Sequence, residues 1–215
     1  MSIPTSFDPL GTLGGGYVTQ NLVLWFDCRM EGDGGVTELT DWVTGTKYAL
    51  ESAGAIENGV LTSTNVLSGG FLRNRNYCVE LVGCALNGRL TVSVTNESGG
   101  AVSNYPAICM DTINGVFGAS RTSSMNFNLC TGANAPGRHI ATATWLRRDE
   151  IPYLNGVRAV LTDAGAGMYG STKYILSIGS HKFCALRVYS QPLTEAQIRH
   201  NNTLDTARYD KTKEL

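Results

Sequence analysis

Four Asn-Gly dipeptides separate short runs of β-branched and aromatic residues along this chain of 215 residues. Asn-Gly favours the two-residue type I′ turn, because both central residues of that turn need positive φ, and such turns join antiparallel strands. No alternation of strand and helix patterns accompanies them, so the sequence predicts an all-β fold of antiparallel strands. The four dipeptides lie at 58–59, 87–88, 114–115 and 155–156.

The composition suits a sheet protein and narrows the class of partner. Charged residues make up 16% of the chain and hydrophobic residues 42%, which is enough for one buried core in a sandwich of this length. The net charge is −1, and no basic cluster is present that could neutralise phosphates, so we expect no nucleic-acid partner. No apolar run approaches the roughly 18 residues of a membrane span, so we expect no membrane insertion.

The two ends of the chain differ from its middle. Residues 1–20 include two prolines and a glycine-rich run, which predict an irregular arm that either docks on a partner subunit or leads flexibly into the fold. The first residues lack the charged and apolar regions of a signal peptide, so we expect a soluble protein made in the cytoplasm. We place the sandwich at 21–209 and a polar tail at 210–215.

One short helix is predicted near the C-terminus. Thr194 and Gln197 have the spacing of a capping box, in which the Thr hydroxyl accepts the Gln N–H and the Gln side chain reaches back. Leu193 and Ile198 have the spacing of the hydrophobic staple that accompanies such a cap. We expect the helix to end at about Leu204.

The six cysteines contain no Cys-x-x-Cys pair and therefore no zinc-site spacing. Most lie in strand-like runs, which predicts buried free thiols that pack as small apolar residues. Disulfides are the alternative, if the protein matures in an oxidising compartment. The cysteines are Cys28, Cys78, Cys84, Cys109, Cys130 and Cys184.

Several stretches resemble the concanavalin A-like lectin/glucanase superfamily, in its laminin-G-like branch of bacterial surface and phage proteins. The resemblance implies a jelly-roll sandwich of two large antiparallel sheets, one of them concave. The stretches are Leu22-Val-Leu-Trp-Phe-Asp27, Leu39-Thr-Asp-Trp42, His139-Ile-Ala-Thr-Ala-Thr-Trp145, Tyr153-Leu-Asn-Gly156, and Ala185-Leu-Arg-Val-Tyr189 with Pro192-Leu-Thr-Glu-Ala-Gln-Ile198 and Asn201-Asn202.

Strand alternation assigns roles to three residues of these stretches. It places His139 and Trp145 on one face of their strand, together with Ala141 and Ala143. Aromatic residues dominate burial in sandwiches, so Trp145 and Tyr153 are interpreted as core anchors. His139 has no second histidine or thiol pair nearby and is interpreted as structural or solvated.

The sequence favours binding over catalysis. Retaining glycoside hydrolysis needs two carboxylates about 5 Å apart, and the glucanases of this superfamily supply them from a Glu-x-Asp-x-(x)-Glu string that is missing here. Asp149 and Glu150 are neighbours, which an extended strand would direct to opposite faces. No nucleophile elbow, His-Glu-x-x-His or phosphate loop occurs. A glycoside hydrolase remains the minor alternative.

Sugar sites in sandwiches combine aromatic rings with amide and guanidinium donors. The residues of this kind outside the expected core are Tyr48, Asn104, Tyr105, Arg138, Tyr169 and Tyr174. Many relatives in the superfamily hold calcium at the rim, and calcium binds six to eight oxygens. The oxygen-rich turn with Asp27, Glu31 and Asp33 is the first candidate for Ca²⁺, Asp111 with Asn114 is the second, and a solvated acidic turn without any cofactor is the alternative.

Two functions therefore compete. The first is a non-catalytic, lectin-like module whose partner is a glycan or surface polysaccharide. The second is a structural or interaction protein, such as a virion decoration or tail-associated subunit that forms a homo-oligomer or packs on other particle subunits. The missing leader, the free cysteines and the glycine-rich arm favour a virion-associated protein, and such particles also use sandwiches to bind host sugars.

Overall fold

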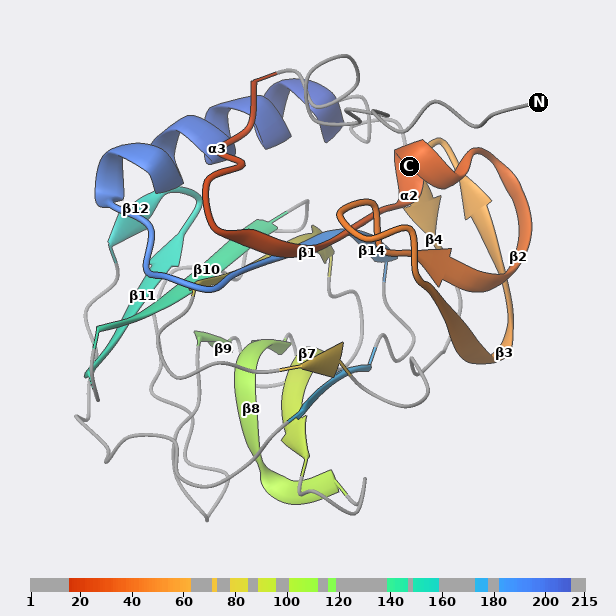
Figure 1. Ribbon diagram of the computed structural model, residues 1–215, viewed down its shortest axis with the longest axis horizontal. Coiled ribbons are helices and arrows are strands. Elements are labelled where there is room, and N and C mark those ends of the chain that lie inside the picture. The colour runs from red at the N-terminus through yellow and green to blue at the C-terminus, as the bar shows by residue number, and fades with distance from the viewer. Residues whose placement is uncertain are drawn as a thin grey trace.

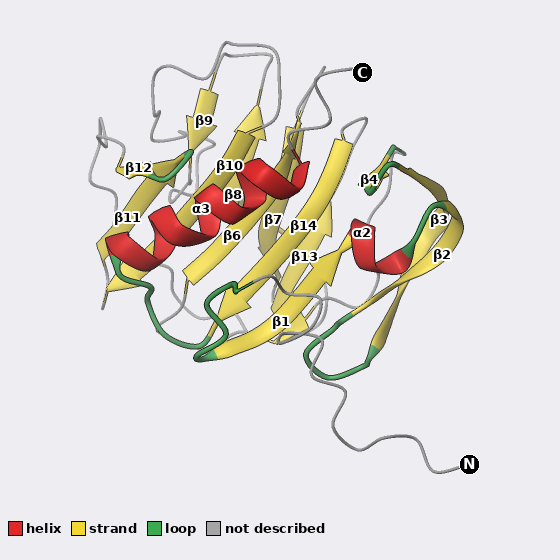
Figure 2. Ribbon diagram, turned by 90° about the horizontal axis from the view of Figure 1, so that it is seen from above, coloured by secondary structure: helices red, strands yellow, loops and turns green. Residues whose placement is uncertain are grey.

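The computed structural model describes residues 16–62, 71–72, 78–84, 89–95, 101–111, 116–118, 139–146, 149–158, 173–177 and 182–209. Side chains are described for 16–62, 78–83, 151, 153–158 and 182–209. These residues form strands in two antiparallel sheets, with a long helix near the C-terminus (Figures 1 and 2). The predicted antiparallel all-β architecture is confirmed.

The larger sheet contains nine strands. Its central strands are buried on both faces, since every described side chain of β6 and all but the first of β14 are buried. The order is β12 (Val157–Arg158), β11 (Asp149–Leu154), β10 (His139–Leu146), β6 (Cys78–Cys84), β14 (Lys182–Tyr189), β4 (Val60–Leu61), β3 (Lys47–Glu57) and β2 (Gly34–Thr40), and β1 (Leu22–Asp27) also pairs with β14.

The smaller sheet contains five strands and lies under the larger one (Figure 1). β10 and β6 of the large sheet contact β8, and β11 contacts β9, so the two sheets form two layers. Phe26, Leu186 and Leu81 are fully buried in one cross-strand row of the large sheet. The small-sheet order is β5 (Phe71–Leu72), β13 (Lys173–Ser177), β7 (Arg89–Thr95), β8 (Ala101–Asp111) and β9 (Val116–Gly118).

Two of the four Asn-Gly dipeptides form the predicted turns. Asn58 and Gly59 have φ of 53° and 74° and join β3 to β4, and Asn155 and Gly156 have φ of 50° and 74° and join β11 to β12. Residues 114–115 lie outside the described residues, but the strands on either side, β8 and β9, pair antiparallel.

The prediction of a hairpin at 87–88 is wrong. This dipeptide lies outside the described residues, but β6 before it belongs to the nine-stranded sheet and β7 after it to the five-stranded sheet. The connection therefore crosses between layers. β6 is instead paired on both sides, with β10 and β14, and burial on both of its faces outweighs the local turn preference.

The C-terminal helix, α3 (Glu195–Tyr209), lies across the outer face of the nine-stranded sheet (Figures 1 and 2). The capping box is confirmed, because the Gln197 amide donates to Thr194 Oγ1 at 3.3 Å and the Thr194 amide donates to Gln197 Oε1 at 2.9 Å. The helix runs one turn beyond the predicted end at Leu204. A second helix, α2 (Cys28–Glu31), is a single turn after β1.

Three of the six cysteines have described side chains, and Cys28, Cys78 and Cys184 are buried thiols that form no disulfide, as predicted. The other three side chains lie outside the described residues. Neither α2 nor α3 is long and apolar enough to cross a membrane in the part of the chain that the structure describes.

Candidate binding site

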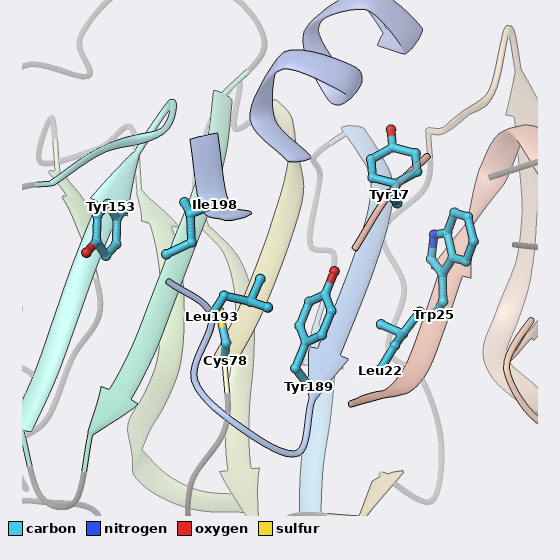
Figure 3. Packing of buried hydrophobic residues seen from close by; sticks show 8 residues of the cluster. All are labelled: Tyr17, Leu22, Trp25, Cys78, Tyr153, Tyr189, Leu193 and Ile198. Atoms are coloured by element: carbon cyan, nitrogen blue, oxygen red, sulfur yellow. The ribbon is translucent and has the colours of Figure 1, made fainter. Parts of the chain in front are cut away.

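The space between α3 and the nine-stranded sheet is filled by a cluster of aromatic and aliphatic residues (Figure 3). Tyr17 and Trp25 pack edge to face, with ring centroids 5.6 Å apart. Tyr153 is 6% exposed, so its role as a core anchor is confirmed, although it lies in the cluster that packs under α3. Trp145 and His139 belong to β10, and their side chains lie outside the described residues. The cluster consists of Tyr17, Leu22, Trp25, Cys78, Tyr153, Tyr189, Leu193 and Ile198.

A buried ion-pair network joins α3 to the same sheet face. Arg187 of β14 donates from Nε to Glu80 Oε2 of β6 at 2.9 Å and from Nη1 to Asp205 Oδ1 of α3 at 3.0 Å. Arg187 and Asp205 have no exposed surface, and Glu80 is 1% exposed. Asn201 completes the network by donating from Nδ2 to Glu80 Oε2 at 2.9 Å. We call these four residues the Arg187 network.

The pKa values of Glu80 and Arg187 are both raised within the Arg187 network. Burial raises the pKa of Glu80, and the Arg187 charge opposes this rise. Burial lowers the pKa of Arg187, but Asp205 and Glu80 outweigh it and hold that pKa well above its ordinary value. Since both carboxylates are buried against a guanidinium, neither reaches a substrate in this structure. The network fastens the helix to the sheet.

Residues 16–20, the end of the predicted arm, pack on α3 without forming regular structure. The Tyr17 hydroxyl donates to Asp205 Oδ1 at 2.8 Å, and the Arg187 guanidinium carbon lies 4.5 Å from the Tyr17 ring centroid. The Val18 amide donates to Asn201 Oδ1 at 3.0 Å. The outer face of β6 and β14 in the nine-stranded sheet is therefore covered by α3 and by this segment together.

Sequence reasoning missed the Arg187 network because hydrophobic periodicity does not register polar residues. The buried face of α3 consists of Ile198, Asn201, Asp205 and Tyr209, which have helical spacing but include two polar members. The available signal was Arg187 itself, a charged residue inside the apolar run of β14. A buried arginine requires carboxylate partners from other elements.

Each of the three carboxylates of the first calcium candidate interacts with different groups of the protein. Asp27 caps α2 by accepting the Arg29 amide at 2.9 Å and also pairs with Arg208, 3.2 Å from Oδ2 to Nη2. Glu31 accepts the Thr40 amide at 2.5 Å. Asp33 accepts the Gly59 amide at 3.2 Å. Among the described side chains, no group of three or more His, Cys, Asp or Glu residues could hold a metal ion. The side chains of the second candidate, Asp111 with Asn114, lie outside the described residues.

The six glycan-binding candidates are dispersed. Tyr48 in β3 is half-buried and packs edge to face on Phe26, with ring centroids 5.4 Å apart. Arg138 and Tyr169 lie outside the described residues. The remaining three, Asn104, Tyr105 and Tyr174, belong to strands of the small sheet.

The pairing of β8 with β7 is interrupted next to two of these candidates. Ser93 pairs with Pro106 and Thr95 pairs with Ala101, so the single residue Val94 stands opposite residues 102–105. We call residues 102–105 the β8 bulge, and β8 is visibly curved (Figure 1). Extra residues of this kind bend a strand, and bulges are enriched beside functional sites. Asn104 and Tyr105 are both in the β8 bulge.

Tyr174 lies across β7 from the β8 bulge. It pairs with Val94 on one side and with Phe71 on the other, so about two strand spacings, or roughly 10 Å, separate it from the bulge. The register therefore brings three of the six candidates to one end of the small sheet. Tyr174 belongs to an apolar row of residues, whereas its neighbour Lys173 is in the row of Thr95.

The sequence of the small sheet has the pattern of a sheet with one solvated face. β7 alternates polar residues (Arg89, Thr91, Ser93, Thr95) with apolar ones, the pattern of an antiparallel strand with one packed and one solvated face. Neither described helix lies on this sheet, since α3 covers the large sheet and α2 contacts β14, β2 and β4 (Figure 1). The candidate binding site is therefore the β8 bulge and the adjoining end of β13.

No family model and no curated protein matches this sequence. Solved structures do match its fold. A Trypanosoma rangeli sialidase in complex with sialic acid aligns over 90% of this chain with a TM-score of 0.65 and 12% identity. The binding domain of botulinum neurotoxin serotype D aligns over 85% with a TM-score of 0.53 and 10% identity. A third match is the binding domain of botulinum neurotoxin DC in complex with SialylT, over 86% with a TM-score of 0.54 and 12% identity.

The matches cover only part of each of these proteins. The chain spans 34% of the sialidase and 51% of each toxin binding domain. At these identities the likeness concerns the fold alone, and it agrees with the antiparallel sheets described above.

Proposed function

We propose that this protein is a non-catalytic glycan-binding module of the concanavalin A-like type, in the laminin-G-like branch. The observation that carries the proposal is the fold likeness to a sialidase bound to sialic acid and to a toxin binding domain bound to SialylT. The two antiparallel layers and the C-terminal helix also support it. A fold by itself does not define a function, so the site is argued separately.

The site that we propose is the β8 bulge. Tyr105 supplies an aromatic ring of the kind that stacks on the apolar face of a sugar, and Asn104 supplies an amide that can donate and accept hydrogen bonds to hydroxyls. A bulge frees backbone groups from the ladder, which adds further polar groups for a ligand.

The burial and pairing of the carboxylates described above support a binding function rather than catalysis. Glu80 and Asp205 share the guanidinium of Arg187 in the buried interior, and the sequence lacks the superfamily's Glu-x-Asp-x-(x)-Glu string. The sialidase likeness covers about a third of that enzyme, so it does not carry its activity over to this chain.

A glycan array probed with the full chain tests this function. We expect reproducible hits that are lost in Tyr105→Ala and retained in Tyr48→Ala, provided that both variants keep the circular dichroism spectrum of the native protein. Running the array with calcium and again with chelator tests the calcium hypothesis in the same experiment. A blank array with well-folded protein would reject glycan binding and favour the structural subunit.

A further inference from the structure

The charged residues of the small sheet are distributed unevenly. Its five strands contain three of them, Arg89, Asp111 and Lys173. Arg89 and Asp111 are register partners across β7 and β8 at one end of the sheet, so residues of opposite charge are paired there in the register. Lys173 is at the other end, and its paired residues, Leu72 and Thr95, carry no charge.

Lys173 lies at the same end of the small sheet as the β8 bulge. Lys173 pairs with Thr95, and Thr95 pairs with Ala101, the last paired residue before the bulge begins. Lys173 is thus about two strand spacings, or roughly 10 Å, from Ala101, a distance that one or two sugar rings span. Lysine, asparagine and tyrosine are therefore juxtaposed around one end of β7.

We propose that the β8-bulge site selects acidic sugars, those with a carboxylate or a sulfate group, and that Lys173 is the residue that determines this selectivity. The inference rests on the proposed glycan binding and specifies its ligand class. An ammonium group recognises either anion as a point charge, whereas Asn104 and Tyr105 match the hydroxyls and the apolar ring face that neutral sugars share with acidic ones. Affinity for any sugar then comes from the bulge, and the preference for acidic sugars from Lys173.

The test is an array that carries lactose and N-acetyllactosamine, each as the neutral sugar, with a terminal α2,3-linked sialic acid, and with a 3-sulfate. We expect the full chain to bind acidic forms about fivefold tighter than neutral ones, the upper end of what an exposed ion pair contributes. The preference should shrink at high salt, because salt screens exposed charges. Comparing the sialylated and sulfated forms shows which anion is preferred.

Three variants separate the possible explanations. Lys173→Gln should bind neutral and acidic forms equally, Lys173→Arg should keep the preference, and Lys47→Gln, an exposed lysine of β3 paired with Glu38, should behave like the native protein. Equal binding of neutral and acidic forms by the native protein would overturn the inference and leave glycan binding intact. An acidic preference that survives in Lys173→Gln would overturn it as well. Absence of binding to every sugar would reject the proposed function and the inference with it.

Discussion

Arg187 of β14 and Asp205 of α3 form a bidentate ion pair in which neither side chain has any exposed surface. The pair joins the centre of the nine-stranded sheet to α3, and its two residues are eighteen positions apart in the chain. Removing one partner of a buried ion pair strongly lowers the stability of a protein, because the other charge then stays buried without compensation. The attachment of α3 therefore depends on a polar contact as well as on the apolar cluster beside it.

Replacing Asp205 should destabilise the protein strongly. Asp205→Ala leaves Arg187 buried with only Glu80 as its acidic partner in the network and removes the acceptor of the Tyr17 hydroxyl. We expect a loss of about 3 to 5 kcal/mol in the free energy of unfolding, measured by urea denaturation. The matched control is Glu195→Ala, which removes an exposed carboxylate paired with Arg199 on the same helix and should change little. Similar effects of the two substitutions would contradict a fastening role for Asp205.

Glu31 should make stability depend on pH. Burial raises the pKa of Glu31 above its ordinary value of 4.5, and the Thr40 amide and hydroxyl oppose this rise. The native state therefore holds this proton more tightly than the unfolded chain does, so the Glu31 contribution to stability is lost as pH rises from about 4.5 through the raised pKa. Glu31→Gln should remove this component, which urea denaturation between pH 4 and pH 7 would reveal. Parallel pH profiles of the two proteins would refute the prediction.

The buried thiols should be chemically inert in the folded protein. Cys28, Cys78 and Cys184 are at most 1% exposed, and burial raises the pKa of Cys28 well above its ordinary value, which suppresses the reactive thiolate. We expect iodoacetamide at pH 8 to leave all three unmodified in native protein and to modify all three in urea, as mapped by mass spectrometry. Rapid native labelling of any of them would show that the described packing opens readily.

A side chain at Gly156 should destabilise the protein. Its φ is +74°, and a Cβ atom there would lie 3.2 Å from atoms of Asn202 on α3. Gly156→Ala should cost about 1 to 2 kcal/mol from the backbone conformation alone, measured as a shift in the urea midpoint. Gly35→Ala is the control, because a Cβ atom at Gly35 in β2 would meet nothing within 4 Å. Equal midpoints for the two variants would contradict this account of the turn.

Some elements were predictable because their signals are local. The capping box of Thr194 and Gln197 and the turns at 58–59 and 155–156 depend on residues close together in sequence, and the structure forms all three. The first strand, Leu22–Asp27, follows from a run of apolar residues with high strand propensity. The candidates Asn104, Tyr105 and Tyr174 came from residue chemistry, and their binding role stays a prediction.

Other features were decided by tertiary structure. Asn201 and Asp205 look like surface residues in the sequence, but Arg187 and Glu80 on other elements make them the buried face of α3, which extends the helix beyond Leu204. The crossing between layers at 87–88 and the register that brings Lys173 to the same end of the small sheet as the β8 bulge likewise depend on pairing between distant strands. The sequence by itself determined the strand character, the turns and the helix cap, because neighbouring residues supply the energy for these. Burial and the compensation of buried charge are shared among segments far apart in the chain, so only the folded arrangement could decide which polar residues lie inside.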